Sequence, residues 1–146
     1  MTSPHELSLD AVLEQELQEW HDDQDLRKAN KVLSEFYTWS KRNRDAMSWL
    51  YRHTKRLAQY QRHCSIATVF GKLRDESDIR IEGYDASLKV PNSFSPLVAR
   101  ILVKSIEGAD KVFKLHSSYF NLLEDDQIPH YDRDGNLVWT VVPDVT

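Results

Sequence analysis

No proline or glycine occurs between Pro4 and Gly71. These are the two residues that most strongly interrupt helices, so the first half of the chain is predicted to be helical. Ser8 is suited to cap a first helix, whose apolar positions recur at helical spacing on one face: Leu9, Val12, Leu13, Leu17 and Trp20. The polar residues 21–25 are expected to end this helix, and Asp25 to cap a second one.

The region that follows keeps a nearly seven-residue apolar repeat, formed by Leu26, Ala29, Leu33, Phe36, Tyr37, Met47, Leu50, Tyr51, Leu57 and Ala58. A polar layer at Ser40, Asn43 and Arg44 interrupts this repeat. The layer is either a break between two helices or a register-setting position in a long helical hairpin, and we favour the break. Residues 1–74 are therefore expected to form a helical hairpin or bundle.

Charge is divided unevenly along the chain, although the net charge is only −4. Residues 1–26 contain eight Asp and Glu and no Lys or Arg, whereas residues 27–74 contain twelve Lys and Arg and only two acids. A segment this basic creates a local positive field, which bears on partners rather than on fold. Either this segment binds a polyanion, or its bases form a solvated helix face balanced by the acids of the first helix.

In the predicted register the bases of the middle segment lie on the side away from the apolar repeat. Aromatic side chains lie among them, at Trp39, Trp49, His53 and His63. Such a mixture suits phosphate contacts supplemented by stacking on bases, although a tryptophan also buries a large area when it packs against another helix. We expect five of the bases to neutralise phosphates: Arg42, Arg52, Lys55, Arg56 and Arg62.

After residue 74 the pattern changes from helical to mixed. Residues 75–78 are mostly acidic and are expected to connect two parts of the chain. Residues 79–82 and 88–90 alternate between apolar and polar side chains, as strands do. The chain is therefore predicted to consist of two units, residues 1–74 and residues 75–146.

Two helices are predicted next in the second unit. Ser95 is suited to cap the first of them, with Pro96 at the first helical position and Gly108 just past the end. Residues 109–123 carry apolar side chains on one face at helical spacing, which predicts the second helix.

Residues 128–131 and 137–142 are predicted to be strands, because the pair Asp134 and Gly135 between them is typical of a hairpin turn. The resulting order of helix, helix and β-hairpin resembles a winged helix-turn-helix domain over residues 75–142. The resemblance is carried by Leu-Glu-Asp-Asp-Gln-Ile at 123–128, similar to the end of a recognition helix, and by Tyr-Asp-Arg-Asp-Gly-Asn-Leu-Val-Trp at 131–139, similar to a wing.

The resemblance implies that the helix at residues 109–123 enters the major groove of DNA. Its polar side offers two cations and three short hydrogen-bonding side chains to phosphates and base edges: Lys111, Lys114, Ser117, Ser118 and Asn121. The alternative is an ordinary polar surface helix.

Few patterns that carry catalysis or bind metals are present. The four glycines are never closer than twelve residues, which excludes a glycine-rich phosphate loop, and no two histidines have the three- or four-residue spacing of a helical zinc site. No metal or cofactor is therefore expected. One catalytic alternative remains, because Glu16 and Glu19 match the first acidic pair of the all-helical Mg²⁺-dependent nucleotide pyrophosphohydrolases, although their second pair is absent.

A different class of function is a small protein-interaction module, such as an inhibitor, an immunity factor or a subunit of a larger complex. The Trp and Arg content of the middle segment supports it, because these residues dominate binding hot spots. The acidic first helix is then either structural or autoinhibitory, in which case it shields the basic segment until a partner displaces it.

No apolar run approaches the about 20 residues needed to cross a bilayer, and a signal-peptide layout is absent, so we expect a cytoplasmic protein without a membrane partner. The predicted fold is mainly helical α+β, with an N-terminal helical hairpin or bundle and a small winged-helix-like unit that ends in a β-hairpin. The expected function is non-catalytic binding of DNA or RNA, in regulation or in a nucleoprotein assembly, by a homo-oligomer or a larger protein complex.

Overall fold

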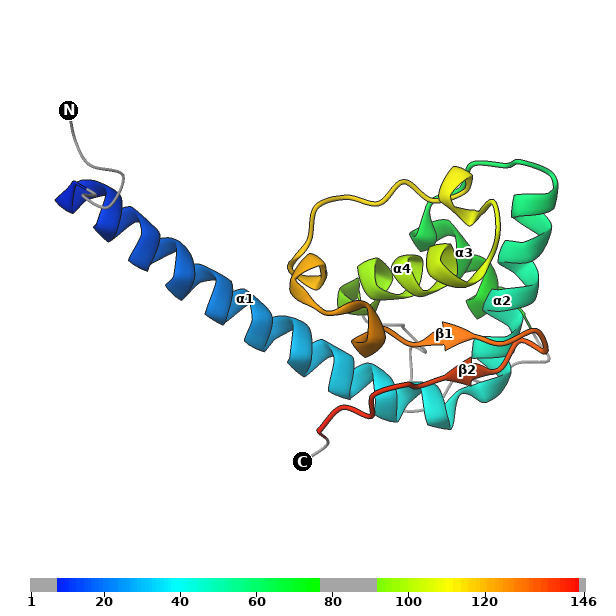
Figure 1. Cartoon of the computed structure of the whole chain (residues 1–146). Helices are drawn as coiled ribbons and strands as arrows, with labels where there is room; N and C mark the ends of the chain where they lie inside the picture. Colours follow the sequence, from blue (N-terminus) through cyan, green and yellow to red (C-terminus); the bar gives the residue numbers. More distant parts are fainter. Residues whose placement is uncertain (1–7, 77–91, 145–146) are drawn as a thin grey trace.

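The computed structural model describes residues 8–76 and 92–144. These residues form four α-helices, short 3₁₀ turns before α4 and between α4 and the hairpin, and one antiparallel two-stranded sheet (Figure 1). The elements are α1 (Leu9–Arg42), α2 (Arg44–Gln59), α3 (Ile66–Asp75), α4 (Ser95–Ser105), β1 (His130–Tyr131) and β2 (Leu137–Val138). The predicted mainly helical α+β class is confirmed. The strands predicted at residues 79–82 and 88–90 lie outside the described residues.

The helix α1 is continuous over 34 residues, so the predicted end of a first helix at residues 21–25 is wrong. Ser8 is the N-cap as predicted, and its hydroxyl accepts a hydrogen bond from the N–H of Ala11 (3.1 Å). Polar residues do not end the helix, because each costs only roughly 0.5 kcal/mol relative to alanine when it is solvated. The side-chain amide of Gln18 also donates to Asp22 one turn further on (2.9 Å).

The predicted break at the polar layer is confirmed, because Asn43 separates α1 from α2. Its backbone is not helical (φ −124°, ψ 48°). The N–H of Asn43 donates to the carbonyl oxygen of Ser40 (3.3 Å), and its side-chain amide donates to the carbonyl oxygen of Trp39 (2.8 Å). Asn43 is only 2% exposed, so these bonds satisfy buried polar groups where the chain changes direction.

The short apolar helix α4 lies inside the fold, with α3 and β1 packed against it. Four of its side chains are at most 1% exposed: Leu97, Val98, Ile101 and Leu102. The helix begins at Ser95 with Pro96 in its first turn, but the predicted cap at Ser95 is wrong: a 3₁₀ turn (Asn92–Phe94) leads directly into the helix, so Phe94 takes the N-cap position without a side-chain cap. The chain then turns at Gly108, whose φ of +86° is left-handed.

The helix predicted for residues 109–123 is wrong. Only two 3₁₀ turns form there, Ala109–Lys111 and Tyr119–Leu122, with irregular backbone between them. Side chains bind the backbone in place of a helical ladder, since Ser118 accepts a hydrogen bond from the N–H of Phe120 (3.1 Å) and Arg100 donates to the carbonyl oxygen of His116 (2.7 Å). The winged-helix resemblance therefore lacks the helix that would read the groove, and it stays a hypothesis.

The predicted β-hairpin forms, but its strands are two residues long and pair His130 with Val138 and Tyr131 with Leu137. The carboxylate of Asp132 organises the turn by accepting hydrogen bonds from the N–H groups of Asn136 and Asp134 (2.9 Å each). These two donors, Asn136 first, lower the pKa of Asp132.

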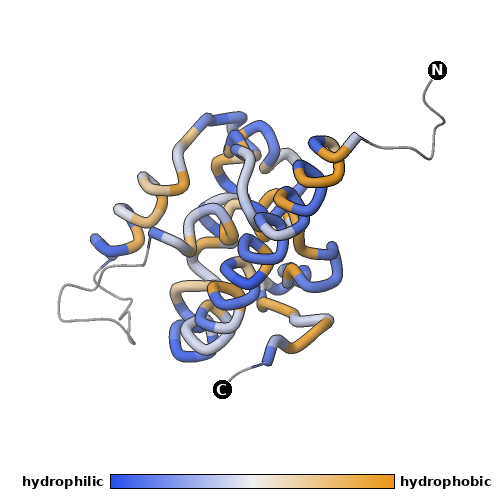
Figure 2. The backbone as a smooth tube through the Cα atoms, turned by 90° about the vertical axis from the view of Figure 1, so that its left-hand side faces the viewer, coloured by the Kyte–Doolittle hydropathy of each residue, from blue (hydrophilic) through white to orange (hydrophobic). Residues whose placement is uncertain are grey.

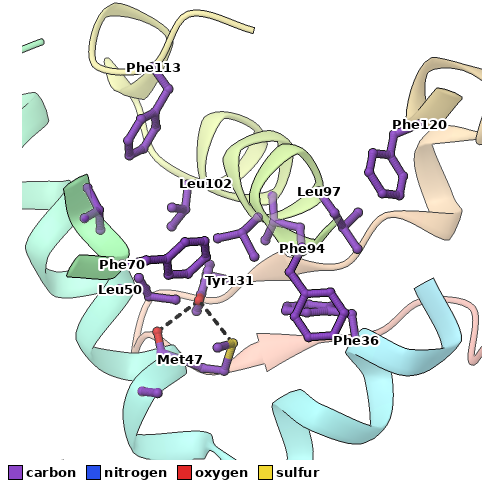
Figure 3. Packing of buried hydrophobic residues seen from close by; sticks show 14 of the residues in the cluster. Phe36, Met47, Leu50, Phe70, Phe94, Leu97, Leu102, Phe113, Phe120 and Tyr131 are labelled. Atoms are coloured by element: carbon purple, nitrogen blue, oxygen red, sulfur yellow. Dashed lines mark hydrogen bonds between the residues drawn. The ribbon is translucent and has the colours of Figure 1, made fainter. Parts of the chain in front are cut away.

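One hydrophobic core joins both predicted units, because buried residues from Ala29 to Tyr131 belong to the same cluster (Figure 3). Tyr131 connects the hairpin to α2. Its ring is 5% exposed, and its hydroxyl donates a hydrogen bond to the carbonyl oxygen of Met47 (2.9 Å). Burial raises the pKa of Tyr131 well above its ordinary value.

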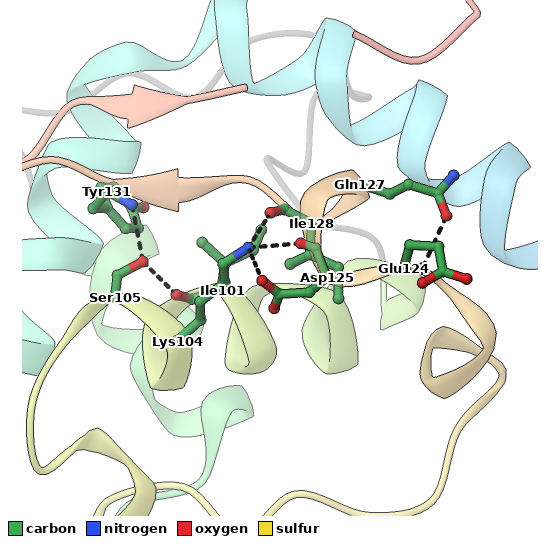
Figure 4. A network of polar contacts seen from close by, with 8 residues as sticks. All are labelled: Ile101, Lys104, Ser105, Glu124, Asp125, Gln127, Ile128 and Tyr131. Carbon is green, nitrogen blue, oxygen red and sulfur yellow. Dashed lines mark hydrogen bonds and ion pairs between the residues drawn. The ribbon is translucent and has the colours of Figure 1, made fainter. Parts of the chain in front are cut away.

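Polar contacts from α4 hold the segment that leads into the hairpin (Figure 4). The ammonium group of Lys104 donates to the carbonyl oxygens of Asp125 (2.7 Å) and Ile128 (2.8 Å). The hydroxyl of Ser105 accepts a hydrogen bond from the N–H of Tyr131 (2.8 Å). The hairpin thus depends on side chains of α4 as well as on its own short ladder. Within the described ranges, no helix combines the length and the apolar character that a bilayer span requires.

We expect Gly135→Ala to lower the free energy of unfolding by about 1–3 kcal/mol. Gly135 has a left-handed φ of +81°, and an added Cβ would lie 2.8 Å from Cδ1 of Tyr51. The matched control is Gly71→Ala inside α3, where an added Cβ would lie 3.9 Å from Nη2 of Arg74, an ordinary contact, and which should raise stability by about 1 kcal/mol. Urea unfolding followed by circular dichroism measures both, and equal effects would contradict the turn geometry.

We also expect stability to fall at high pH through Tyr131. Its pKa is higher in the folded state than in the unfolded state, so its contribution is complete below about pH 10 and is lost as the pH rises further. Tyr131→Phe should remove part of this alkaline loss and should cost about 1 kcal/mol at neutral pH, where it deletes the bond to Met47. Unfolding curves at several pH values test both effects, and an unchanged pH dependence would exclude Tyr131 as the cause.

Candidate nucleic-acid interface

A row of bases lies on the outer side of α2 and is called here the α2 basic face: Arg44, Arg52, Lys55 and Arg56. All four side chains are exposed, and they lie within about 120° of one another around the helix axis. The opposite side of α2 is buried through Ala46, Met47, Leu50 and Thr54. Because the apolar side fixes the rotation of the helix, the bases must face solvent together.

Within residues 8–76 and 92–144, no carboxylate neutralises these bases. All twelve Lys and Arg of residues 27–74 are exposed, and the one ion pair in this part of the chain joins Lys104 to Asp125 (3.5 Å). The acids of residues 10–25 lie on the end of α1 that projects away from the rest of the fold (Figure 1). Since α1 is continuous, the acids of residues 10–19 cannot fold back over these bases, and those of residues 22–25, one turn before Arg27 and Lys28, form no ion pair with them among the described residues.

An aromatic stack borders the α2 basic face. The rings of Trp49 and His53 are nearly parallel (10°), with centroids 4.6 Å apart, and both side chains are partly exposed. Trp39 behaves differently, because it is 3% exposed and packs against Phe36 and Phe94. The packing alternative thus describes Trp39, whereas Trp49 retains a partly open indole beside the bases.

The pKa of His53 is affected by burial and by the cations around it. Burial lowers its pKa first, the nearby cations Lys72 and Arg56 lower the pKa further, and Glu76 acts in the opposite direction. The Nε2 atom is buried and has no hydrogen-bond partner among the described residues. Since α3 packs against α2 and its exposed Lys72 acts on His53, α3 adds a cation near the α2 basic face.

A pocket of about 290 Å³ lies at the corner between α1 and α2, against the hairpin. Its lining includes two cations, Lys41 and Arg44, and the indole of Trp139. The ammonium group of Lys41 lies 4.3 Å above the ring of Tyr37, whose edge meets Trp139 with centroids 5.0 Å apart. Two bases and exposed ring surface in one hollow suit a phosphate with an adjoining planar group.

A second pocket, of about 510 Å³, lies between the start of α3 and the irregular segment after Val112. Its polar lining comprises His63, Ser65, Lys114 and His116, and its described lining contains no acid. Lys114 therefore lies beside the connection between α2 and α3. This connection contains the exposed Arg62. This arrangement extends the positive surface beyond the end of α2.

The structure brings together some of the predicted site residues and separates others. Arg52, Lys55 and Arg56 share the α2 basic face, Arg62 follows the end of α2, and Arg42 lies at the end of α1. The predicted groove-reading residues do not share a helix face, because the helix at 109–123 is absent. They are Lys111 in a 3₁₀ turn, Lys114 and Ser117 in irregular backbone, Ser118 as an N-cap, and Asn121 as a partner of Arg100.

Arg100 is the most buried Lys or Arg of the described fold, since only 9% of its surface is exposed. Its guanidinium donates to the carbonyl oxygens of Pro96 (2.9 Å) and His116 (2.7 Å) and to the side-chain oxygen of Asn121 (3.0 Å). Burial lowers its pKa. Every one of these partners is neutral, and the bonds fix the irregular segment, so we assign Arg100 and Asn121 a structural role.

Sequence reasoning did not place Arg44 and Lys72 at the interface. Arg44 was assigned to the polar layer, although its spacing of eight residues from Arg52 puts both on one side of a helix. Lys72 lies on another helix, and its approach to His53 depends on how α3 packs against α2. Only the first of these two residues could have been found from spacing.

The acids of the catalytic alternative, Glu16 and Glu19, lie on the projecting part of α1. Among the residues that the structure describes, no three His, Cys, Asp or Glu side chains gather as metal ligands would. Comparisons with protein-family models, with curated proteins and with solved structures found no match for this chain.

We expect the pKa of His53, measured by NMR titration, to lie below about 6.5 and to rise in Lys72→Met, because this variant removes the larger of the two charge effects. Lys28→Met, which removes an exposed cation of α1, is the matched control and should leave the pKa of His53 unchanged. A pKa that ignores Lys72 would contradict the proximity of α3 to the aromatic stack.

Proposed function

We propose that this protein binds nucleic acid without catalysis, through the α2 basic face and the cations next to it. The observation that carries the proposal is that the twelve bases of residues 27–74 are exposed and that none of them forms an ion pair within the described part of the chain. Cations in this state exchange water and counterions for phosphates at little structural cost, and the release of counterions from the polyanion drives binding.

The dimensions of α2 agree with this function. Its 16 residues span about 24 Å, a length over which duplex DNA carries about 14 negative charges. The α2 basic face offers four cations over that length, and Lys72 adds another at its side. The partly open ring of Trp49 supports an additional contact with an unpaired base, which every single strand provides.

The test is fluorescence anisotropy with mixed-sequence DNA duplexes and with single strands, at several salt concentrations. We expect Arg52→Glu/Arg56→Glu to weaken binding by more than about tenfold and to reduce the slope of log K against log salt by about 1.8, since two phosphate contacts are lost. Arg52→Lys/Arg56→Lys keeps both charges and is the matched control, which should bind nearly as the parent does.

Two results would contradict the proposal. One is a parent protein whose affinity does not change with salt, because phosphate contacts always depend on salt. The other is a charge-reversed variant that binds as tightly as the parent. Lys111→Glu/Lys114→Glu should have the smaller effect, because these two bases do not share a helix with the α2 basic face.

A second candidate function, a protein-interaction module, is supported by a separate observation. The projecting end of α1 exposes large apolar side chains that the described fold does not cover. Rows of exposed apolar residues are typical of protein-binding sites. This surface does not overlap the α2 basic face, so the two functions are compatible.

A further inference from the structure

The first half of α1, residues 9–25, projects from the rest of the molecule and is called here the arm (Figure 1). It exposes four large apolar side chains, Leu9 (73%), Leu13 (53%), Leu17 (56%) and Trp20 (56%), which are called here the arm stripe. Their spacing places them within about 80° around the helix axis. Figure 2, seen from the side of the arm, shows hydrophobic positions recurring along these turns.

The arm stripe is not a continuation of the core-facing side of α1. The core-facing side chains in the second half of the helix include Ala29, Leu33 and Phe36. At 100° per residue their side lies roughly 150° away from the arm stripe. Most of the body therefore packs on the opposite side of α1, and the C-terminal segment reaches Ser34, about 55° from the centre of the stripe.

Charge restricts what can occupy this side. The arm contains seven acids and no Lys or Arg. The same side of α1 continues past the arm with three bases, Arg27, Lys31 and Arg42, and one acid, Glu35, all exposed, and with Lys28 and Lys41 at its borders. A partner that covers the arm stripe must bring cations to the acids of the arm. The bases in the second half of the same α1 helix cannot do so, because the helix does not fold back on itself.

A second copy of the chain supplies them when the two α1 helices run antiparallel. With the two-fold axis near residues 25 and 26, the middle of α1, the acidic arm of each copy lies along the basic half of the other. Asp10 is then level with Lys41 and nearest to Arg42 on its own flank, Asp23 is level with Lys28 and nearest to Arg27, and one like-charged pair, Glu16 and Glu35, falls at the same level. A parallel pair would instead place the acids of one arm beside the acids of the other.

The same alignment offers apolar contacts to the arm stripe. Leu17 lies opposite Ser34, whose hydroxyl donates to the carbonyl oxygen of Asp144 (2.7 Å) and so holds the C-terminal segment on α1. That segment exposes Val141 (39%) and Val142 (59%) next to this point. Apolar surface and cations therefore occur together where the arm of a second copy would lie, beside the C-terminal segment.

We propose that the protein forms an antiparallel homodimer in which the arm of each copy docks on the basic half of α1 of the other. The contact is isologous, as closed two-fold dimers require. In this dimer the acidic helix does not shield the bases of its own chain, as the autoinhibitory hypothesis supposed. Its acids lie over bases of the other copy instead. It does not depend on nucleic-acid binding, since the α2 basic face stays outside the contact.

Sedimentation equilibrium of the full chain tests the stoichiometry. We expect a dimer at low salt whose dissociation constant rises with salt, and a monomer for Leu13→Glu/Leu17→Glu with an unchanged circular dichroism spectrum, because both leucines lie outside the core. Tyr60→Ser alters an even more exposed apolar side chain (73%) after α2 and should stay dimeric, as should Arg52→Glu/Arg56→Glu. A monomeric parent, or a dimer unaffected by the leucine changes, would overturn the proposal.

Disulfide cross-linking tests the direction of the helices. In a Cys64→Ser background, Leu13→Cys and Thr38→Cys are opposite each other between antiparallel copies but about 37 Å apart within one helix, too far for an internal disulfide. The double variant should form covalent dimers on oxidation, and Leu13→Cys alone should not. Rapid cross-linking of Leu13→Cys alone would indicate parallel arms and would overturn the antiparallel assignment.

Discussion

The change of direction at Asn43 is the constraint on which the other features depend. Its side-chain amide and its N–H bind carbonyl oxygens of the preceding turn, so the buried chain leaves α1 and enters α2 without an unsatisfied polar group. The two longest helices then diverge, and α3, α4 and the hairpin fill the space beside them. An unbroken helix would carry the bases of α2 in line with α1 and would leave the core open.

The same geometry separates the charges of the protein. The acids of residues 10–25 remain on the arm, and the bases of residues 27–74 remain on the outer sides of α1 and α2. Opposite charges in one chain often form ion pairs, yet the described residues contain a single ion pair, between Lys104 and Asp125. The continuous helix holds the acids of residues 10–19 away from the bases, and the acids of residues 22–25 form no ion pair with Arg27 or Lys28, although they are only one turn away. A positive surface and an acidic arm are therefore both available to other molecules.

Sequence patterns predicted the elements whose cause is local. The cap at Ser8, the break near Asn43, the helix start beside Pro96 and the turn at Gly135 each depend on a residue with a strong backbone preference, and all are confirmed, whereas Ser95 is not the cap that the sequence predicted. The prediction of a helix at residues 109–123 is wrong. The apolar spacing that suggested a helix is also compatible with two separate 3₁₀ turns, which form there instead. Arg100, distant in sequence, binds the carbonyl oxygen of His116 and holds the irregular form.

The sequence by itself determined the mainly helical class, the position of the break and the solvent exposure of the bases on α2, because these follow from propensity and from the period of the apolar residues. Tertiary structure decided the approach of Lys72 to His53, the hollow at the corner and the projection of the arm. The apolar residues of the arm have the same spacing as those of the core. Only the packing of the body on the opposite side of α1 leaves them uncovered, and spacing along one helix contains no information about which side its neighbours occupy.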